Sequence, residues 1–153
     1  MITDPRVPGV TEWLKKLEEC LRLCTNGNGA AYDYLSVIMK SHRLVDDLFD
    51  EIESWTGDNT YALAQLLLVD LPANTFFHAN SMALLPHHLT VLNAWRDSND
   101  WKKSGDRPKE VHATVISQQT AEIFILVAYL TGGYEHMRKV SLKVRELFLE
   151  EDI

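Results

Sequence analysis

Carboxylates crowd one short segment of the sequence. Asp46, Asp47, Asp50 and Glu51 form the pattern Asp-Asp-x-x-Asp-Glu. On a helix, spacings of three and four residues place Asp47 beside Asp50 and Glu51, and Asp46 beside Asp50. Clustered carboxylates can hold Mg²⁺, which binds a diphosphate and neutralises the charge that develops during its cleavage or transfer. One hypothesis is therefore a Mg²⁺-dependent hydrolase or transferase that acts on a diphosphate or a nucleotide through these four residues.

The same segment resembles the aspartate-rich motif of helical prenyl-diphosphate enzymes and, more loosely, the carboxylate helices of all-α nucleotide pyrophosphatases. The resemblance implies that the clustered carboxylates are metal ligands. It covers about six residues, and the second acidic motif of these families is missing, since only Asp70 precedes a long stretch without charge. The alternative is a solvated acidic face on which Arg43 pairs with Asp47 along the helix.

His42 is the candidate for proton transfer. It lies in an apolar stripe, and Asp46 follows one helical turn later. A neighbouring carboxylate can raise the basicity of a histidine and make it a general base. The alternative is a core histidine whose hydrogen bonds its neighbour satisfies.

The other histidines have no spacing that identifies a metal or nuclease site. No HxxxH pair occurs, and no glutamate stands three residues before a histidine, so the helical signatures of zincins and di-iron proteins are absent. Arg107 and His112 have the Rx4H spacing, which resembles the nuclease motif of HEPN domains, but chance produces this spacing readily. A site assembled in three dimensions would draw on His78, His88, His112 and Asp70.

Helical periodicity runs through the segments that carry these residues. It predicts helices at about 11–24, 30–55, 60–69, 75–84, 86–95, 108–131 and 134–150, with a polar loop over 97–107. Pro86 is expected to open a helix, and Gly132-Gly133 to end one. Two strands are the alternative for 108–131, which is rich in Val, Ile and Thr. We predict an all-α fold, a single domain over 1–153, with five to seven helices around a central apolar helix at about 109–131.

Composition excludes several classes of function. The formal net charge is -7, which opposes binding to nucleic acid or to anionic lipid. The most apolar stretch, 121–130, is too short to span a bilayer, and no secretory signal is readable at the N-terminus. Cys20 and Cys24 stand four residues apart in a helical pattern, where a disulfide is poorly favoured. We expect a cytoplasmic protein with two buried free thiols.

Charge is distributed unevenly along the chain. From Thr60 to Trp95 the only Asp, Glu, Lys or Arg is Asp70, and from Val111 to Tyr134 the only one is Glu122. Because a solvent-facing helix normally carries charge, these segments are expected either to form the middle of the bundle or to be covered by a partner chain. Acidic residues at the end of the second helix and Arg138, Lys139, Lys143 and Arg145 in the last helix form opposed patches, which can pair within or between chains.

Strong catalytic motifs are missing, and the uncharged helices and opposed charges favour binding to protein. We predict a non-catalytic helical interaction protein, such as an adaptor, an inhibitor or an assembly component, that forms a homodimer and needs no cofactor. Mg²⁺ is the expected cofactor only under the alternative enzyme hypothesis.

Overall fold

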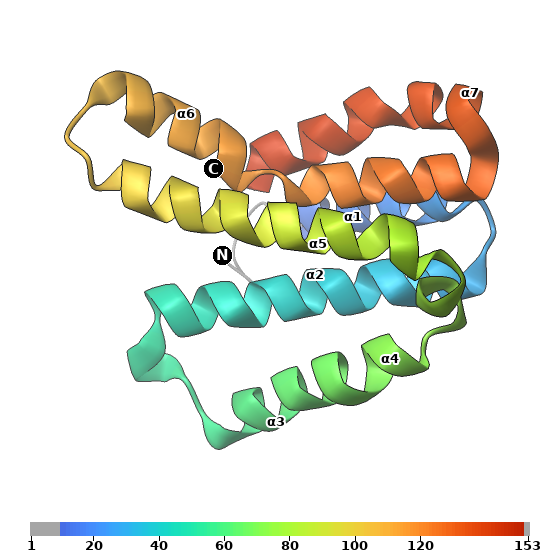
Figure 1. The fold of residues 1–153 in the computed structure, drawn as a ribbon, viewed down its shortest axis with the longest axis horizontal. Helices are drawn as coiled ribbons and strands as arrows, with labels where there is room; N and C mark the ends of the chain where they lie inside the picture. Colours follow the sequence, from blue (N-terminus) through green and yellow to red (C-terminus); the bar gives the residue numbers. More distant parts are fainter. Residues whose placement is uncertain (1–9, 152–153) are drawn as a thin grey trace.

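The computed structural model describes the backbone of residues 10–151 and the side chains of residues 10–149 (Figure 1). In this part of the chain all regular elements are helical, and no strand forms. In chain order they are α1 (Val10–Thr25), α2 (Gly29–Asp50), the 3-10 helix η1 (Ile52–Ser54), α3 (Gly57–Gln65), the π-helix η2 (Leu66–Asp70), α4 (Leu71–Ala73), α5 (Thr75–Lys102), α6 (Arg107–Ser117) and α7 (Thr120–Glu151). The prediction of an all-α bundle is confirmed.

α7 consists of two helical arms joined by a tight turn. Gly133 has φ 80° and ψ -177°, a backbone conformation that is essentially restricted to glycine. Figure 1 shows the chain reversing its direction at the right-hand end of α7. The predicted helix end at Gly132-Gly133 is therefore correct, and the two arms of α7 lie against each other.

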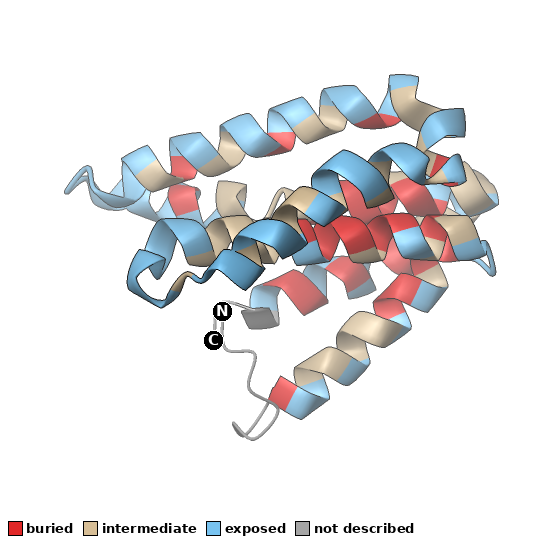
Figure 2. Cartoon of the chain, turned by 90° about the horizontal axis from the view of Figure 1, so that it is seen from below, coloured by how far each residue is buried: buried red, intermediate tan, exposed pale blue. Residues whose placement is uncertain are grey.

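The hydrophobic core forms where α1, α2 and the two arms of α7 meet, and Figure 2 shows buried positions concentrated there. Its buried members include Cys24 from α1, Tyr34 and Leu35 from α2, Leu84 from α5, Ile123, Phe124 and Val127 from the first arm of α7, and Val144, Leu147 and Phe148 from the second. Core residues recur three or four positions apart within a helix, for example Cys20 with Cys24 in α1, Ala31 with Tyr34 and Leu35 in α2, and Val140 with Val144 in α7, as expected for one apolar face.

Polar contacts fasten the end of α1 to the turn of α7. The Thr131 hydroxyl donates to the backbone carbonyl of Cys24 at 2.8 Å, and a ring nitrogen of His136 lies 2.7 Å from the carbonyl of Leu23. These bonds satisfy carbonyls that the end of α1 leaves without helical partners. Cys20 and Cys24 are both buried and unpaired, as predicted.

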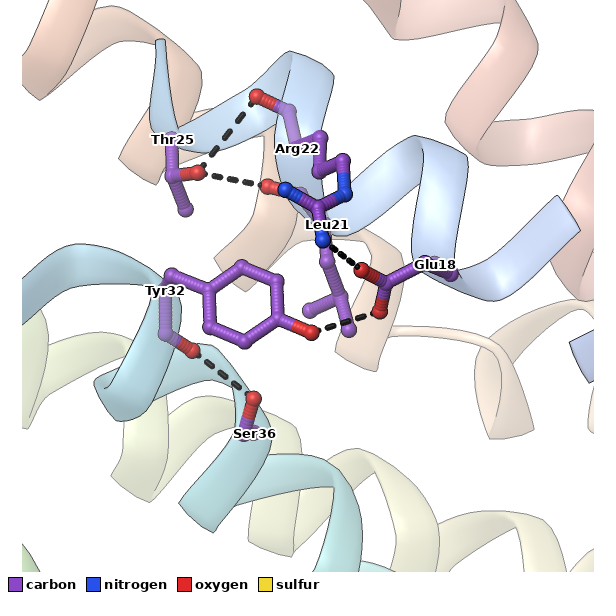
Figure 3. Close-up of polar contacts among 6 residues, drawn as sticks. All are labelled: Glu18, Leu21, Arg22, Thr25, Tyr32 and Ser36. Atoms are coloured by element: carbon purple, nitrogen blue, oxygen red, sulfur yellow. Dashed lines mark hydrogen bonds and ion pairs between the residues drawn. The ribbon is translucent and has the colours of Figure 1, made fainter. Parts of the chain in front are cut away.

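Polar side chains also join α1 to α2 (Figure 3). The Glu18 carboxylate accepts a hydrogen bond from the Tyr32 hydroxyl at 2.5 Å and forms an ion pair with Arg22 at 2.6 Å. The guanidinium of Arg22 lies 5.7 Å from the centre of the Tyr32 ring, within range of a cation–π contact. These contacts hold the two helices on either side of the Asn26-Gly27 turn, where both residues have positive φ.

Short polar side chains set the start of four helices. In each case the residue before the helix accepts a hydrogen bond from a backbone N–H in the first turn, which otherwise has no partner. The pairs are Asn28 with Ala31, Thr56 with Asn59, Asn74 with Phe77 and Asp106 with Lys109. Local sequence therefore determines where these helices begin.

α5 is longer than predicted because it runs through Pro86 and continues to Lys102. The expected helix start at Pro86 is therefore wrong, and the loop expected over 97–107 is shorter, because only 103–106 lies between α5 and α6. Proline inside a helix removes the hydrogen bond to the carbonyl four residues earlier, here that of Met82. Since Met82 and Pro86 are both exposed, water can hydrate this carbonyl and the helix continues.

The predicted helix over 108–131 is broken between Ser117 and Thr120. The first part, α6, packs against α5 outside the core, whereas the first arm of α7 is central. Within the described residues one stretch, Arg107–Leu149, contains a window long and apolar enough by composition to cross a membrane. The same stretch supplies the α7 part of the hydrophobic core, as the central helix of a soluble bundle also would.

Candidate functional site

A cavity of about 330 Å³ lies between the second half of α2, the second half of α5 and the junction of α6 with α7. Its apolar wall comes from Met39, Val45, Val91, Leu92, Trp95 and Phe148, and its polar groups come from His42, Arg43, Asp46, Asp50, Lys102, Ser117, Gln118 and Thr120. A concave space with apolar walls and a few converging polar groups is the usual form of a small-molecule site. Several of the sequence candidates therefore meet at one place.

His42 lies on the wall of this cavity and is tied to α7. Its Nδ1 is 2.9 Å from Thr120 Oγ1. Burial, with a smaller contribution from His88, lowers the pKa of His42 to about 4. The sequence predicted increased basicity from Asp46, and this prediction is wrong because the loss of hydration dominates. The imidazole is uncharged at neutral pH, so it can exchange hydrogen bonds with a ligand but is a weak base.

The four predicted metal ligands do not converge. Asp46 and Asp50 line the cavity, whereas Asp47 does not, and Glu51 is exposed beyond the end of α2. Among the described side chains of residues 10–149, no group of three or more His, Cys, Asp or Glu is arranged to hold a metal ion. The geometry therefore lends no support to the Mg²⁺ hypothesis.

The acidic residues also account for where α2 ends. The helix was predicted to reach Trp55 but stops at Asp50. Its last turn contains carboxylates and no basic residue, and negative charge at this end of a helix opposes the helix dipole. Glu51 then leaves the helical conformation, with φ -128° and ψ 44°. The carboxylates thus destabilise the last turn of α2, although the predicted ligand cluster requires Asp46, Asp47, Asp50 and Glu51 to lie on one continuous helix.

Asp46 is the partly buried carboxylate of the cavity. Burial raises the pKa of Asp46, and the negative charges of Asp50 and Asp47 raise it further. The nearby Trp95 indole N–H favours the charged carboxylate and so lowers the pKa of Asp46, in the opposite direction. The cavity therefore presents an acid that is harder to ionise than usual next to a neutral histidine.

A second polar pair lies within the bundle near the cavity. The Tyr34 hydroxyl lies 2.6 Å from His88 Nε2, and the rings of Tyr34, Phe77 and His88 stack with centroids 5.9 to 6.1 Å apart. Burial raises the pKa of Tyr34 and lowers the pKa of His88. The sequence did not single out this pair, because Tyr34 and His88 are 54 residues apart and neither belongs to a motif.

The remaining candidates stay on the surface. Arg107 and His112 are exposed on α6 and do not line the cavity, and His78 is exposed near the start of α5. Two basic residues of the last helix pair with carboxylates outside the acidic end of α2. Lys143 forms an ion pair with Glu19, and Arg145 with Glu122. Of the opposed patches, the basic one is therefore partly neutralised within the chain by other carboxylates.

The two uncharged segments have different environments. Most of 121–128 is buried in the core, as expected. Between Thr60 and Trp95, by contrast, only Phe76, Leu84 and Val91 are buried. The interpretation that this whole segment forms the middle of the bundle is wrong. Figure 2 shows α5, the long helix at the upper edge, with only isolated buried positions.

The exposed apolar residues of α5 form one line. Met82, Leu85, Leu89 and Leu92 are 92%, 53%, 68% and 59% exposed, and we call them the α5 seam. Their spacing of three, four and three residues is the heptad spacing of helices that pair with another helix. Figure 1 shows α5 on the near side of the bundle with no helix in front of it. α5 is thus apolar both where it packs on the bundle and along this open side.

Comparisons with known proteins do not add to this geometry. No protein-family model matches the chain, and neither a curated protein nor a solved structure is significantly similar to it. The arrangement of the side chains therefore carries the functional argument.

Proposed function

We propose that this chain is a non-catalytic helical interaction protein, an adaptor, inhibitor or assembly component, that binds another helix along the α5 seam. The observation that carries the proposal is the alignment of four large exposed apolar side chains at heptad spacing. Single exposed apolar residues are common on monomeric proteins, whereas a continuous line of them is what helix-binding surfaces use.

Charge supports the same conclusion. From Leu71 to Trp95 the sequence has no Asp, Glu, Lys or Arg. Depletion of charged residues distinguishes the centre of a protein interface from the rest of a protein surface. A helix that is apolar on more than one side is normally covered on more than one side, whereas the four side chains of the α5 seam are exposed.

The charge of the whole chain bears on the class of partner. At a formal net charge of -7, phosphates of nucleic acid and anionic lipid headgroups are repelled. A protein helix is the partner that matches an uncharged heptad line. The buried free thiols of Cys20 and Cys24 fit the cytoplasmic location that we propose.

Site-specific photo-crosslinking in the cells that express the protein tests this proposal. The photoreactive residue benzoylphenylalanine replaces Leu89 in the seam or Leu142 on α7. Leu142 is the matched control, since it is 66% exposed compared with 68% for Leu89 but lies among basic residues. We expect a cross-linked protein adduct from position 89 and none from position 142. Equal yields at the two positions, or none at position 89, would overturn the proposal.

A further inference from the structure

We infer that the helix that covers the α5 seam is α5 of a second copy of this chain, and that the two helices run antiparallel across a two-fold axis. The inference rests on the proposed function, because it names the partner for the same seam. Cyclic dimers of this kind use the same surface patch on both subunits.

Charge favours self-pairing through this surface over self-pairing elsewhere. Two copies that each carry a formal net charge of -7 repel each other when charged faces meet. The outer side of α5 between Thr75 and Trp95 is free of Asp, Glu, Lys and Arg, so identical surfaces can approach there without like charges in contact. Two copies of an acidic chain can therefore meet along the seam without contact between like charges.

The spacing of the seam is the same when it is read in either direction. Intervals of three, four and three residues are symmetric about a point midway between Leu85 and Leu89. A two-fold axis through this point places Met82 opposite Leu92 of the second copy and Leu85 opposite Leu89 of the second copy. All four apolar side chains of each copy then meet apolar side chains of the other, as a and d positions do in antiparallel helix pairs.

The residues at the two ends of the seam favour one relative direction of the two paired helices. Arg96 continues the heptad line seven residues after Leu89, and His78 continues it seven residues before Leu85. A parallel pair would bring Arg96 against Arg96 of the second copy. An antiparallel pair brings Arg96 against His78 of the second copy and so avoids two cations in direct contact. Like charges at facing positions are destabilising, so the antiparallel arrangement is favoured.

The bundle reduces the loss of conformational entropy that accompanies pairing of the two helices. Two heptads are too few to hold isolated helices together, because each free peptide would first have to become ordered. Here the bundle already orders α5, since Phe76, Leu84 and Val91 on its inner side are buried. Preorganisation of this kind leaves more of the contact free energy for association.

Sedimentation equilibrium of the purified full-length chain tests whether the partner is a second copy. Over roughly 1 μM to 0.5 mM, a range that covers moderate protein affinities, we expect the mass to rise from 17.5 kDa toward twice that value. Leu89→Lys should remain at the monomer mass at concentrations where the wild type is a dimer, because it places a charge in the centre of the contact. The matched variant Leu142→Lys should behave as the wild type does.

Distances between spin labels test the direction of pairing. A nitroxide is attached to His78→Cys or, separately, to Arg96→Cys. Burial raises the pKa of Cys24 to about 12 and raises the pKa of Cys20, so the native thiols react slowly with the label. Each labelled position lies nine residues from the axis, so an antiparallel dimer gives about 28 Å between equivalent labels at both sites, from the helical rise and the usual interaxial distance. A parallel dimer gives about 10 Å at both sites.

The outcomes separate this inference from the proposed function. A monomeric wild type over the whole concentration range overturns the second-copy inference, while an adduct at Leu89 with a different protein leaves the proposed function intact. If Leu89→Lys does not weaken the dimer, the seam is not the dimer interface. The absence of a cross-linked adduct at position 89 would lead to the same conclusion. Short distances at both labels overturn the antiparallel arrangement alone. A seam-dependent dimer with about 28 Å at both labels supports the inference in full.

Discussion

The Nδ1 atom of His42 lies 2.9 Å from the hydroxyl oxygen of Thr120, which joins the second half of α2 to the first residue of α7. The two residues are 78 positions apart in the sequence. The contact keeps a neutral imidazole on the wall of the cavity, since burial and the nearby His88 lower its pKa to about 4. A histidine in this state makes stability depend on pH in a defined direction.

The first prediction concerns acid stability. Unfolded His42 binds a proton near its ordinary pKa of 6.5, whereas folded His42 binds one only near 4, so the unfolded state holds more protons between these values. His42 should therefore lower the free energy of unfolding as the pH falls from about 7.5 to about 5, by at most about 2 kcal/mol. Urea denaturation at both pH values measures this loss. His42→Gln should lose less unfolding free energy between these pH values than the wild type does, whereas the exposed control His112→Gln should lose as much as the wild type. If the loss in His42→Gln equals that of the wild type, His42 is not its source.

The second prediction concerns the Tyr34–His88 pair. Tyr34→Phe removes the hydroxyl that lies 2.6 Å from His88 Nε2 and leaves a largely buried ring nitrogen without this partner. The expected cost is about 1–2 kcal/mol of unfolding free energy. Urea denaturation measures it against Tyr61→Phe, whose ring is 77% exposed and which should be neutral. Equal stabilities of the two variants would show that the hydrogen bond makes no net contribution.

The third prediction concerns the turn of α7. Gly133→Ala forces a Cβ atom onto a backbone with φ 80° and ψ -177°. The surroundings leave space for that atom, so the penalty of about 1–3 kcal/mol comes from the backbone conformation alone. Gly29→Ala is the control, because Gly29 also has open space but lies in α2 without positive φ. Thermal melting should show a lower midpoint for Gly133→Ala only, and two unchanged midpoints would contradict the strain argument.

The fourth prediction separates the interaction hypothesis from the Mg²⁺ hypothesis. Addition of about 10 mM Mg²⁺ or Mn²⁺ should leave the melting temperature unchanged, because a metal site would stabilise the folded state by mass action. Asp46→Asn should raise the melting temperature at neutral pH without metal. Burial disfavours the charged carboxylate, and Asn still offers an oxygen to the Trp95 indole.

Asp33→Asn, on the exposed side of α2, is the control for this substitution and should change little. A melting temperature that rises with Mg²⁺ in the wild type but not in Asp46→Asn would restore the enzyme hypothesis.

Local signals in the sequence predicted much of the secondary structure. The turn after α1 follows from Asn26 and Gly27, and the reversal within α7 follows from Gly133, because few other residues tolerate a positive φ. The caps Asn74 and Asp106 were not predicted, although their side chains accept hydrogen bonds from neighbouring backbone where α5 and α6 begin. Such effects act within a few residues, so one sequence is enough to recognise them.

Local sequence did not predict the continuation of α5 through Pro86 or the residues that line the cavity. Pro86 predicts a helix start, but α5 continues through Pro86, which is exposed together with Met82, so water can hydrate the carbonyl that loses its partner. His42, Trp95 and Thr120 meet in one cavity, although no motif connects them. Whether a carbonyl can be hydrated, or whether distant side chains converge, depends on how whole helices pack.

The sequence by itself determined that the chain is helical and that 60–95 is almost without charge. Only the tertiary structure decided that Leu84 and Val91 are buried in the bundle while Leu85 and Leu89 are exposed. All four are equally apolar, so composition does not separate a core face from an open one. Burial is a property of the neighbours that a side chain acquires on folding, and those neighbours come from segments far away in the chain.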